Sequence, residues 1–91
     1  MSKSLLITYD LSAPGRNYEG LIKKIKSYSG YARITESSYI ITTKKEPETV
    51  RDELLLLIDE NDKIYVGLLT KPAAWYGLSD SVANWLQKYL S

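Results

Sequence analysis

An aspartate stands where an apolar segment meets a turn, at Asp10 in the stretch LLITYDLSAPGRNY. A carboxylate at the end of a buried strand is a ligand that Mg²⁺ or Mn²⁺ prefers, and such a cation can polarise a phosphate and activate water. The same aspartate, followed by Pro14 and Gly15, is also typical of a turn in which the carboxylate accepts N–H bonds from residues 12 and 13. The residue types leave both roles open for Asp10.

The turn after Asp10 has features of a phosphate site. Gly15 allows close approach of the backbone, Arg16 can donate two parallel hydrogen bonds, and the start of the following helix carries a partial positive charge. The stretch SAPGRN has fewer glycines than a phosphate-binding loop. An exposed turn is therefore the simpler interpretation, and a ligand loop is the alternative.

Basic residues near this turn are candidates for nucleic-acid contact. They are Arg16, Lys23, Lys24, Lys26 and Arg33, with Lys44 and Lys45 further along the chain. Tyr28 and Tyr31 add aromatic surface on which a base could stack. Four glutamates are interleaved with them, and the net charge is only +1, so binding needs a local patch. The alternative is a charge-mixed face in contact with solvent.

Composition excludes several kinds of chemistry. The 91 residues include no Cys and no His, which removes disulfides, thiol catalysis, imidazole catalysis and zinc sites built on those side chains. No apolar run approaches the length of about 18 residues that a membrane span needs. The start, MSKSLLITYD, turns polar too early for a signal peptide. We expect a cytoplasmic domain with no membrane partner.

The elements that would position these residues follow from periodicity and turn signals. Apolar alternation and short apolar runs predict strands over 4–10, 31–36, 37–43 and 62–69. Helical spacing predicts helices over 18–29, after Pro47, and over 79–90, with Asn17 and Ser79 as N-caps. Gly30 is expected to end the first helix in a left-handed conformation. This order predicts one α+β domain over 1–91, a ferredoxin-like βαββαβ sandwich with an extra C-terminal helix.

Two further stretches carry alternatives. DEND at 59–62 gathers three carboxylates but is too short for a calcium loop, so a turn is expected. Trp75, Tyr76 and Trp85 make the tail rich in aromatic residues. Trp85 lies at helical spacing with other apolar residues, which favours docking on the sheet or over a partner subunit. An aromatic patch for a base or a peptide is the alternative.

Three stretches of residues 4–69 form a pattern: the first strand ends in YD, SSYIITT follows at 37–43, and DENDKIYVGLL follows at 59–69. This pattern resembles the CRISPR-associated endonuclease family two. Short SinR-like relatives of that family are similar over nearly the whole chain. Their likeness is in YDL-x-x-PG-x-x-Y, VRDEL…ID-x-ND and AW-x-G…NWL, which stand here at 9–18, 50–62 and 74–86.

The resemblance implies a nucleic-acid-associated homodimer. In that family the aspartate that closes the first strand, here Asp10, is proposed to bind a divalent cation together with its copy in the partner, and so to cut a phosphodiester of RNA or DNA. The family's Arg-rich segment after the aspartate is reduced here to Arg16, so nuclease activity is the weaker part of the expectation. A homodimer joined at the strand 62–69 or at the C-terminal segments would cover an exposed sheet edge.

Two other function classes remain open from the sequence. One is a non-catalytic dimeric module that binds a protein partner, in a defence, toxin–antitoxin or phage regulatory role. The other is a sensor that holds a nucleotide between SAPGR and a neighbouring subunit.

Overall fold

The computed structural model describes residues 2–12 and 18–90 of the chain. Four strands and three helices follow one another: β1 (Lys3–Asp10), α1 (Glu19–Lys26), β2 (Gly30–Thr35), β3 (Ser38–Thr43), α2 (Pro47–Leu55), β4 (Lys63–Leu68) and α3 (Asp80–Tyr89). The predicted α+β class is confirmed. None of the helices in the described ranges is both long and apolar enough to cross a membrane.

The four strands form one antiparallel sheet in the order β2-β3-β1-β4. β1 lies in the interior and pairs with β3 on one side, where Leu5 is opposite Ile41, and with β4 on the other, where Leu5 is opposite Leu68. β2 and β4 are therefore the two edges of the sheet. The two-residue turn at 36–37 joins β2 to β3, close to the predicted hairpin.

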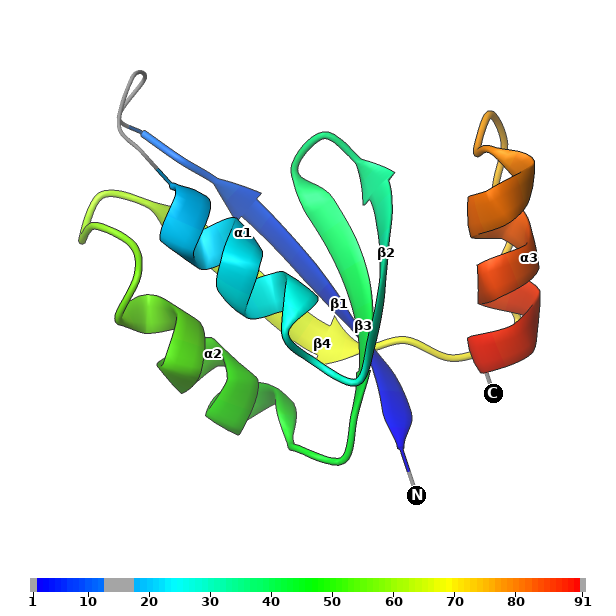
Figure 1. The fold of residues 1–91 in the computed structure, drawn as a ribbon, viewed down its shortest axis with the longest axis horizontal. Coiled ribbons are helices and arrows are strands. Elements are labelled where there is room, and N and C mark those ends of the chain that lie inside the picture. Colours follow the sequence, from blue (N-terminus) through cyan, green and yellow to red (C-terminus); the bar gives the residue numbers. More distant parts are fainter. Residues whose placement is uncertain (1, 13–17, 91) are drawn as a thin grey trace.

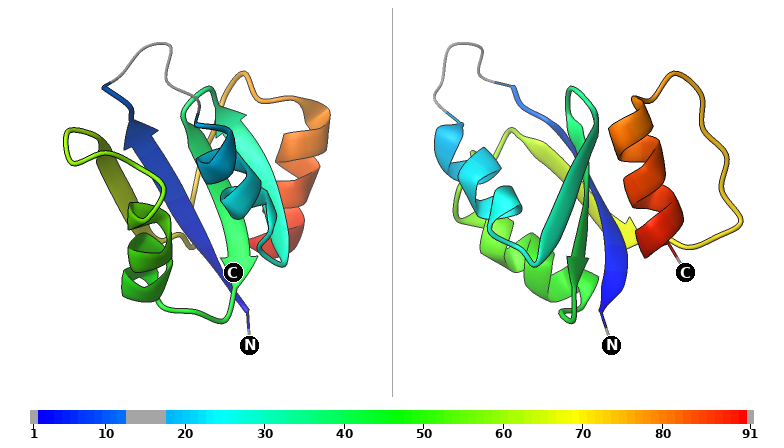
Figure 2. Two further views of the ribbon diagram at one scale, coloured as in Figure 1. Left: turned by 60° about the vertical axis from the view of Figure 1, so that its left-hand side comes forward. Right: turned by 45° about the vertical axis from the view of Figure 1, so that its right-hand side comes forward.

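Helices α1 and α2 cover one face of the sheet, and α3 lies on the opposite face (Figures 1 and 2). Side chains from β1 and β3 alternate between these faces because successive residues of a strand point to opposite sides. The larger core lies under α1 and α2 and consists of Leu5, Ile7, Leu21, Ile25, Tyr39, Ile41, Val50 and Leu54.

The second core lies between the sheet and α3. Its buried members are Ile40, Leu86 and Leu90, and the partly buried Trp75, Leu78, Val82 and Trp85 pack against them. The hydroxyl oxygen of Ser79 accepts a hydrogen bond of 3.2 Å from the backbone N–H of Val82, so Ser79 is the N-cap of α3, as predicted. The expected docking of the Trp85 face on the sheet is confirmed.

The expectation for Gly30 is wrong. α1 ends at Lys26, with Ser27 as its C-cap, and Gly30 is the first residue of β2. A Cβ at Gly30 would lie 2.7 Å from Oγ1 of Thr42, so close strand packing is what the glycine permits there. In the described part of the chain, the glycine with a positive φ, 83°, is Gly77, just before α3.

Candidate functional site

Asp10 is the last residue of β1 and is exposed. It lies directly opposite Lys63 of β4 in the antiparallel register. Because side chains alternate along a strand, Asp10 shares a face with Leu6 and Thr8, the face that α3 covers in part. A shallow depression beside it is lined by Thr8, Tyr9, Asp10, Lys63, Ile64 and Tyr65.

The surroundings of Asp10 do not fit a resident divalent cation within one chain. Over residues 2–12 and 18–90, no three His, Cys, Asp or Glu side chains group so that they could hold a metal ion. The register neighbour Lys63 is itself a cation, which opposes binding of another. One carboxylate supplies at most two of the six oxygens that Mg²⁺ requires. A metal at Asp10 would need a second chain to contribute ligands.

The alternative prediction is that Asp10 accepts the backbone N–H bonds of residues 12 and 13. For residue 12 this prediction is wrong. The backbone N–H of Ser12 donates instead to Oδ1 of Asp62, at 2.8 Å, and the Ser12 hydroxyl donates to the same oxygen at 3.0 Å. Residue 13 lies outside the described residues. The expected phosphate turn and its basic residue Arg16 also lie outside them.

Asp62 holds three segments together. Besides its two bonds from Ser12, its carboxylate accepts the Tyr18 hydroxyl at 3.1 Å on each oxygen and the backbone N–H of Asp59 at 2.8 Å. Desolvation opposes ionisation, but the bonds from the Ser12 and Asp59 backbone and from the Ser12 and Tyr18 hydroxyls outweigh it and hold the pKa of Asp62 below its ordinary value. The DEND stretch is thus a turn whose last carboxylate anchors β1 and the start of α1.

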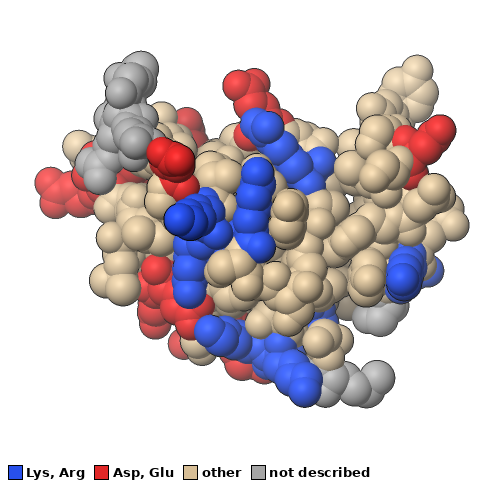
Figure 3. All heavy atoms as spheres, viewed as in Figure 1, with Lys and Arg blue, Asp and Glu red and all other residues tan. Residues whose placement is uncertain are grey.

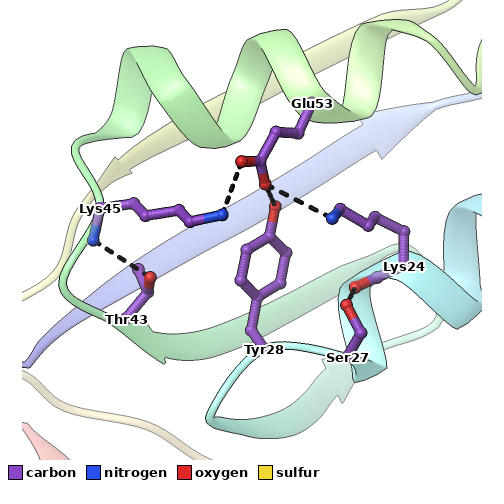
Figure 4. A network of polar contacts seen from close by, with 6 residues as sticks. All are labelled: Lys24, Ser27, Tyr28, Thr43, Lys45 and Glu53. Atoms are coloured by element: carbon purple, nitrogen blue, oxygen red, sulfur yellow. Dashed lines mark hydrogen bonds and ion pairs between the residues drawn. The ribbon is translucent and has the colours of Figure 1, made fainter.

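A second polar network joins α1 to α2 through Glu53 (Figure 4). The Tyr28 hydroxyl donates to Oε1 of Glu53 at 2.5 Å, and the Lys45 ammonium donates to Oε2 at 2.6 Å. The Lys24 ammonium lies 3.6 Å from Oε1. The bonds from Lys45 and Tyr28 are the main causes that lower the pKa of Glu53 below its ordinary value.

This network changes the roles expected of two residues. Tyr28 was a candidate for base stacking, but its hydroxyl is bound to Glu53, and the ammonium groups of Lys24 and Lys45 lie 5.5 and 5.7 Å from its ring centroid. Desolvation, followed by the bond to Glu53, raises the pKa of Tyr28. Lys24, a candidate for phosphate contact, is already paired with Glu53.

The remaining candidates lie together along α1 and the edge strand β2. We define the α1–β2 strip as Lys23, Lys26, Tyr31 and Arg33, all of which are exposed. Lys26 is about 200° from Lys24 around α1, and so faces away from α2, toward β2. Its ammonium lies 5.9 Å from the ring centroid of Tyr31, whose side chain is 44% exposed.

Arg33 extends the strip along β2. It shares a strand face with Tyr31, two residues earlier. Its guanidinium donates a hydrogen bond of 2.8 Å to the Glu36 carbonyl and lies 5.9 Å from the ring centroid of buried Tyr39, which orients it. Figure 3 shows Lys and Arg side chains gathered over this face of the molecule, with Asp and Glu close to them.

Sequence reasoning named the residues of the α1–β2 strip as candidates, but it did not predict the hydrogen-bond partners of Asp62 or Glu53. The hydrogen-bond partners of Asp62 include residues up to 50 positions away, and Glu53 bonds to Tyr28, 25 positions away. No local signal reveals such partners.

The chain matches no family model, and it shows no significant similarity to a curated protein or to a solved structure. The resemblance to the CRISPR-associated endonuclease family two therefore stays a prediction. The function has to be argued from the geometry of the chain.

Proposed function

We propose that this chain is a ferredoxin-like, homodimeric domain that associates with RNA or DNA through the α1–β2 strip. The observation that carries the proposal is an exposed aromatic ring, Tyr31, beside the Lys26 ammonium and on the same strand face as Arg33. A cation beside an accessible ring, with a second cation on the same strand face, suits a nucleic acid, whose phosphates pair with the cations while a base stacks on the ring.

The fold supports the first part of this proposal. The strand order β2-β3-β1-β4, with two helices on one face, is the arrangement that a βαββαβ chain with right-handed crossovers produces. α3 is the extra element, and it covers part of the other face. Tyr31 and Arg33 of β2 are on the side of the sheet away from α3, opposite Ile41 and Tyr39, and both are exposed.

Charge supports weak, salt-sensitive binding. The net charge of +1 supplies little long-range attraction, so affinity depends on the few cations of the strip. Within the described part of the chain, Lys23 and Lys26 form no ion pair with a carboxylate, whereas Lys24 and Lys45 are paired with Glu53. Phosphate contacts release counterions, so each contact adds to the salt dependence of the affinity.

Phosphodiester cleavage is not part of the proposal. The resembled family implies a cation at Asp10, but the described residues of one chain do not offer a set of ligands for it. Binding does not imply cleavage here: Asp10 and Arg33 line the same surface depression, but the described residues of one chain gather no set of metal ligands there.

The test is binding of labelled single-stranded and double-stranded RNA and DNA, followed by fluorescence anisotropy over a range of salt concentrations. The variant Lys23→Ala/Lys26→Ala removes two cations from the strip. The matched control, Lys71→Ala/Lys88→Ala, removes two exposed cations from the α3 side of the molecule, with the same change in net charge.

The strip variant should lose affinity, and its slope of log K against log salt should fall by about 1.4 for a single strand, at about 0.7 per phosphate contact. The control variant should bind as wild type does. Equal losses in the two variants, or no binding by wild type at low salt, would overturn the proposal.

A further inference from the structure

Exposed leucines mark one side of the molecule. In the part of the chain that the structure describes, three leucines are exposed, namely Leu55 (46%), Leu56 (86%) and Leu68 (60%). All three belong to β4 or to the end of α2, which packs against β4. Apolar side chains gathered on one surface of a small domain are typical of an association site.

β4 is also an edge strand, and it has few features that would prevent pairing with another strand. Within the described residues, no strand pairs with its outer side, so its backbone N–H and C=O groups there are open to another strand. Its only charged residue is Lys63, at its first position. The other edge strand, β2, carries Arg33 in its interior and an irregular register between Arg33 and Thr35. Charge and irregularity discourage strand addition at β2 but not at β4.

The two apolar spots lie at opposite ends of β4 on one face of the sheet. α2 runs antiparallel to β4, so Leu55 at the end of α2 lies near the start of β4 (Figure 1). Leu55 is about 200° from Glu53 around α2, and so faces away from α1, toward the β4 edge. Leu68 ends β4 and shares the α2 face with Val66, because these residues are opposite Leu5 and Ile7 of β1.

We propose that two copies of this chain join β4 to β4 in antiparallel pairing, to form one continuous eight-stranded sheet. A two-fold axis through the middle of β4 exchanges its ends, so Leu68 of each copy meets Leu55 of the other, and the interface is self-complementary. The inference deepens the homodimer of the proposed function and rests on it. Both α1–β2 strips then lie on the same face of the joined sheet, at its two outer edges.

This arrangement separates the two Asp10 side chains. Three strand spacings, β1 to β4, β4 to β4 and β4 to β1, amount to about 14 Å at about 4.8 Å each. Asp10 is opposite Lys63 at the start of β4, and in an antiparallel pair the two starts lie at opposite ends. Since Mg²⁺ binds oxygens at about 2.1 Å, the two carboxylates cannot share one ion in this dimer.

The first test measures the oligomeric state of the full chain by sedimentation velocity. Opposite charges are introduced at Leu68 and at Leu55, in separate variants. Leu68→Lys alone and Leu55→Glu alone each bury unpaired charges in the homodimer, and we expect monomers. Mixed together, the two variants place the introduced ammonium of one chain against the introduced carboxylate of the other, and we expect a heterodimer. Tyr76→Lys alters an almost fully exposed side chain away from β4 and should leave the wild-type dimer intact.

The outcomes are distinct from those of the nucleic-acid experiment. A monomeric wild-type chain, or a dimer unaffected by Leu68→Lys, would overturn the interface whether or not the α1–β2 strip binds nucleic acid. Both leucines are exposed, so circular dichroism should show each single variant to be folded. A dimer without nucleic-acid binding would leave the interface standing and overturn the proposed function.

The second test measures the separation of the two Asp10 positions. The chain has no cysteine, so Asp10→Cys introduces a single attachment point for a spin label. In the β4-paired dimer the label-to-label distance should exceed about 14 Å, the sum of three strand spacings. A pair of labels in close contact would instead indicate a dimer in which the Asp10 residues face each other.

Discussion

The Tyr28 hydroxyl donates a hydrogen bond of 2.5 Å to Oε1 of Glu53, which ties the segment after α1 to the middle of α2. Lys45 holds the other carboxylate oxygen at 2.6 Å, and Lys24 lies on the far side of the tyrosine ring (Figure 4). Both helices pack on the sheet through the larger core, and this network adds a polar contact between them. An aromatic residue that the sequence offers for ligand stacking is here part of the scaffold.

Tyr28→Phe should destabilise the fold while leaving nucleic-acid binding unchanged. The substitution removes a hydrogen bond to a carboxylate, and we expect a loss of about 1.5–3 kcal/mol in the free energy of unfolding, the range for a bond to a charged group. Urea unfolding at neutral pH measures it. The control Tyr76→Phe removes a hydroxyl from a side chain that is 99% exposed and should not change stability.

The same network predicts how stability depends on pH. The pKa of Glu53 in the folded protein lies below its ordinary value of 4.5, so its contribution is present above 4.5 and is lost as pH falls through the folded value. The pKa of Tyr28 is raised above its ordinary value of 10.0, so its contribution is present below 10.0 and is lost as pH rises through the folded value. In a plot of urea midpoint against pH, Glu53→Gln should show a smaller slope on the acid side than wild type. An unchanged acid slope would contradict the contribution of Glu53 to stability.

Asp62→Asn should loosen the contact between the end of β1, the start of α1 and the start of β4. The amide cannot accept all the bonds that the carboxylate receives from Ser12, Tyr18 and Asp59, since one of its two polar atoms is a donor. We expect a lower thermal midpoint, and faster amide hydrogen exchange at Ser12. Asp52→Asn, which alters an exposed carboxylate bonded to its neighbour Arg51, is the control and should show neither effect.

Substitutions at Tyr31 test the contribution of stacking to nucleic-acid binding separately from that of charge in the α1–β2 strip. Replacement of a stacking aromatic costs about 1–3 kcal/mol per base, so Tyr31→Leu should weaken single-strand binding roughly 5- to 150-fold. Tyr31→Phe keeps the ring and should bind as wild type does. Because neither substitution removes a cation, the salt dependence should be the same in both, and a change in it would contradict the assigned role.

Unfolding of the layer formed by α3 can be measured separately from unfolding of the rest of the domain. Both tryptophans, Trp75 and Trp85, pack in the second core, so their fluorescence reports on that core alone. Leu86 is 3% exposed there, and Leu86→Ala should cost about 2–5 kcal/mol. We expect the fluorescence transition of the variant to come at lower urea than its circular-dichroism transition; coincident transitions would show that the α3 layer unfolds with the sheet.

Local pattern in the sequence predicted much of the fold. Apolar alternation indicated the strands, Pro47 marked the start of α2, and Ser79 the cap of α3, each within a few residues of where the structure has them. These features depend on neighbours in the chain, because backbone preference, periodicity and capping act over one or two turns of helix or strand. The same local information also selected Lys23, Lys26 and Arg33 as surface cations.

Tertiary structure alone decided the roles of the polar residues. Lys24 and Lys26 are two residues apart and equally basic in the sequence, yet one is paired with Glu53 and the other lies beside exposed Tyr31. Asp62 gained its partners because the fold brings Ser12 and Tyr18 to it from up to 50 residues away. Such contacts depend on how helices pack on the sheet, which no short stretch of sequence contains. That packing also left β4, among the described residues, as an unpaired edge beside exposed leucines, where we propose that a second copy joins.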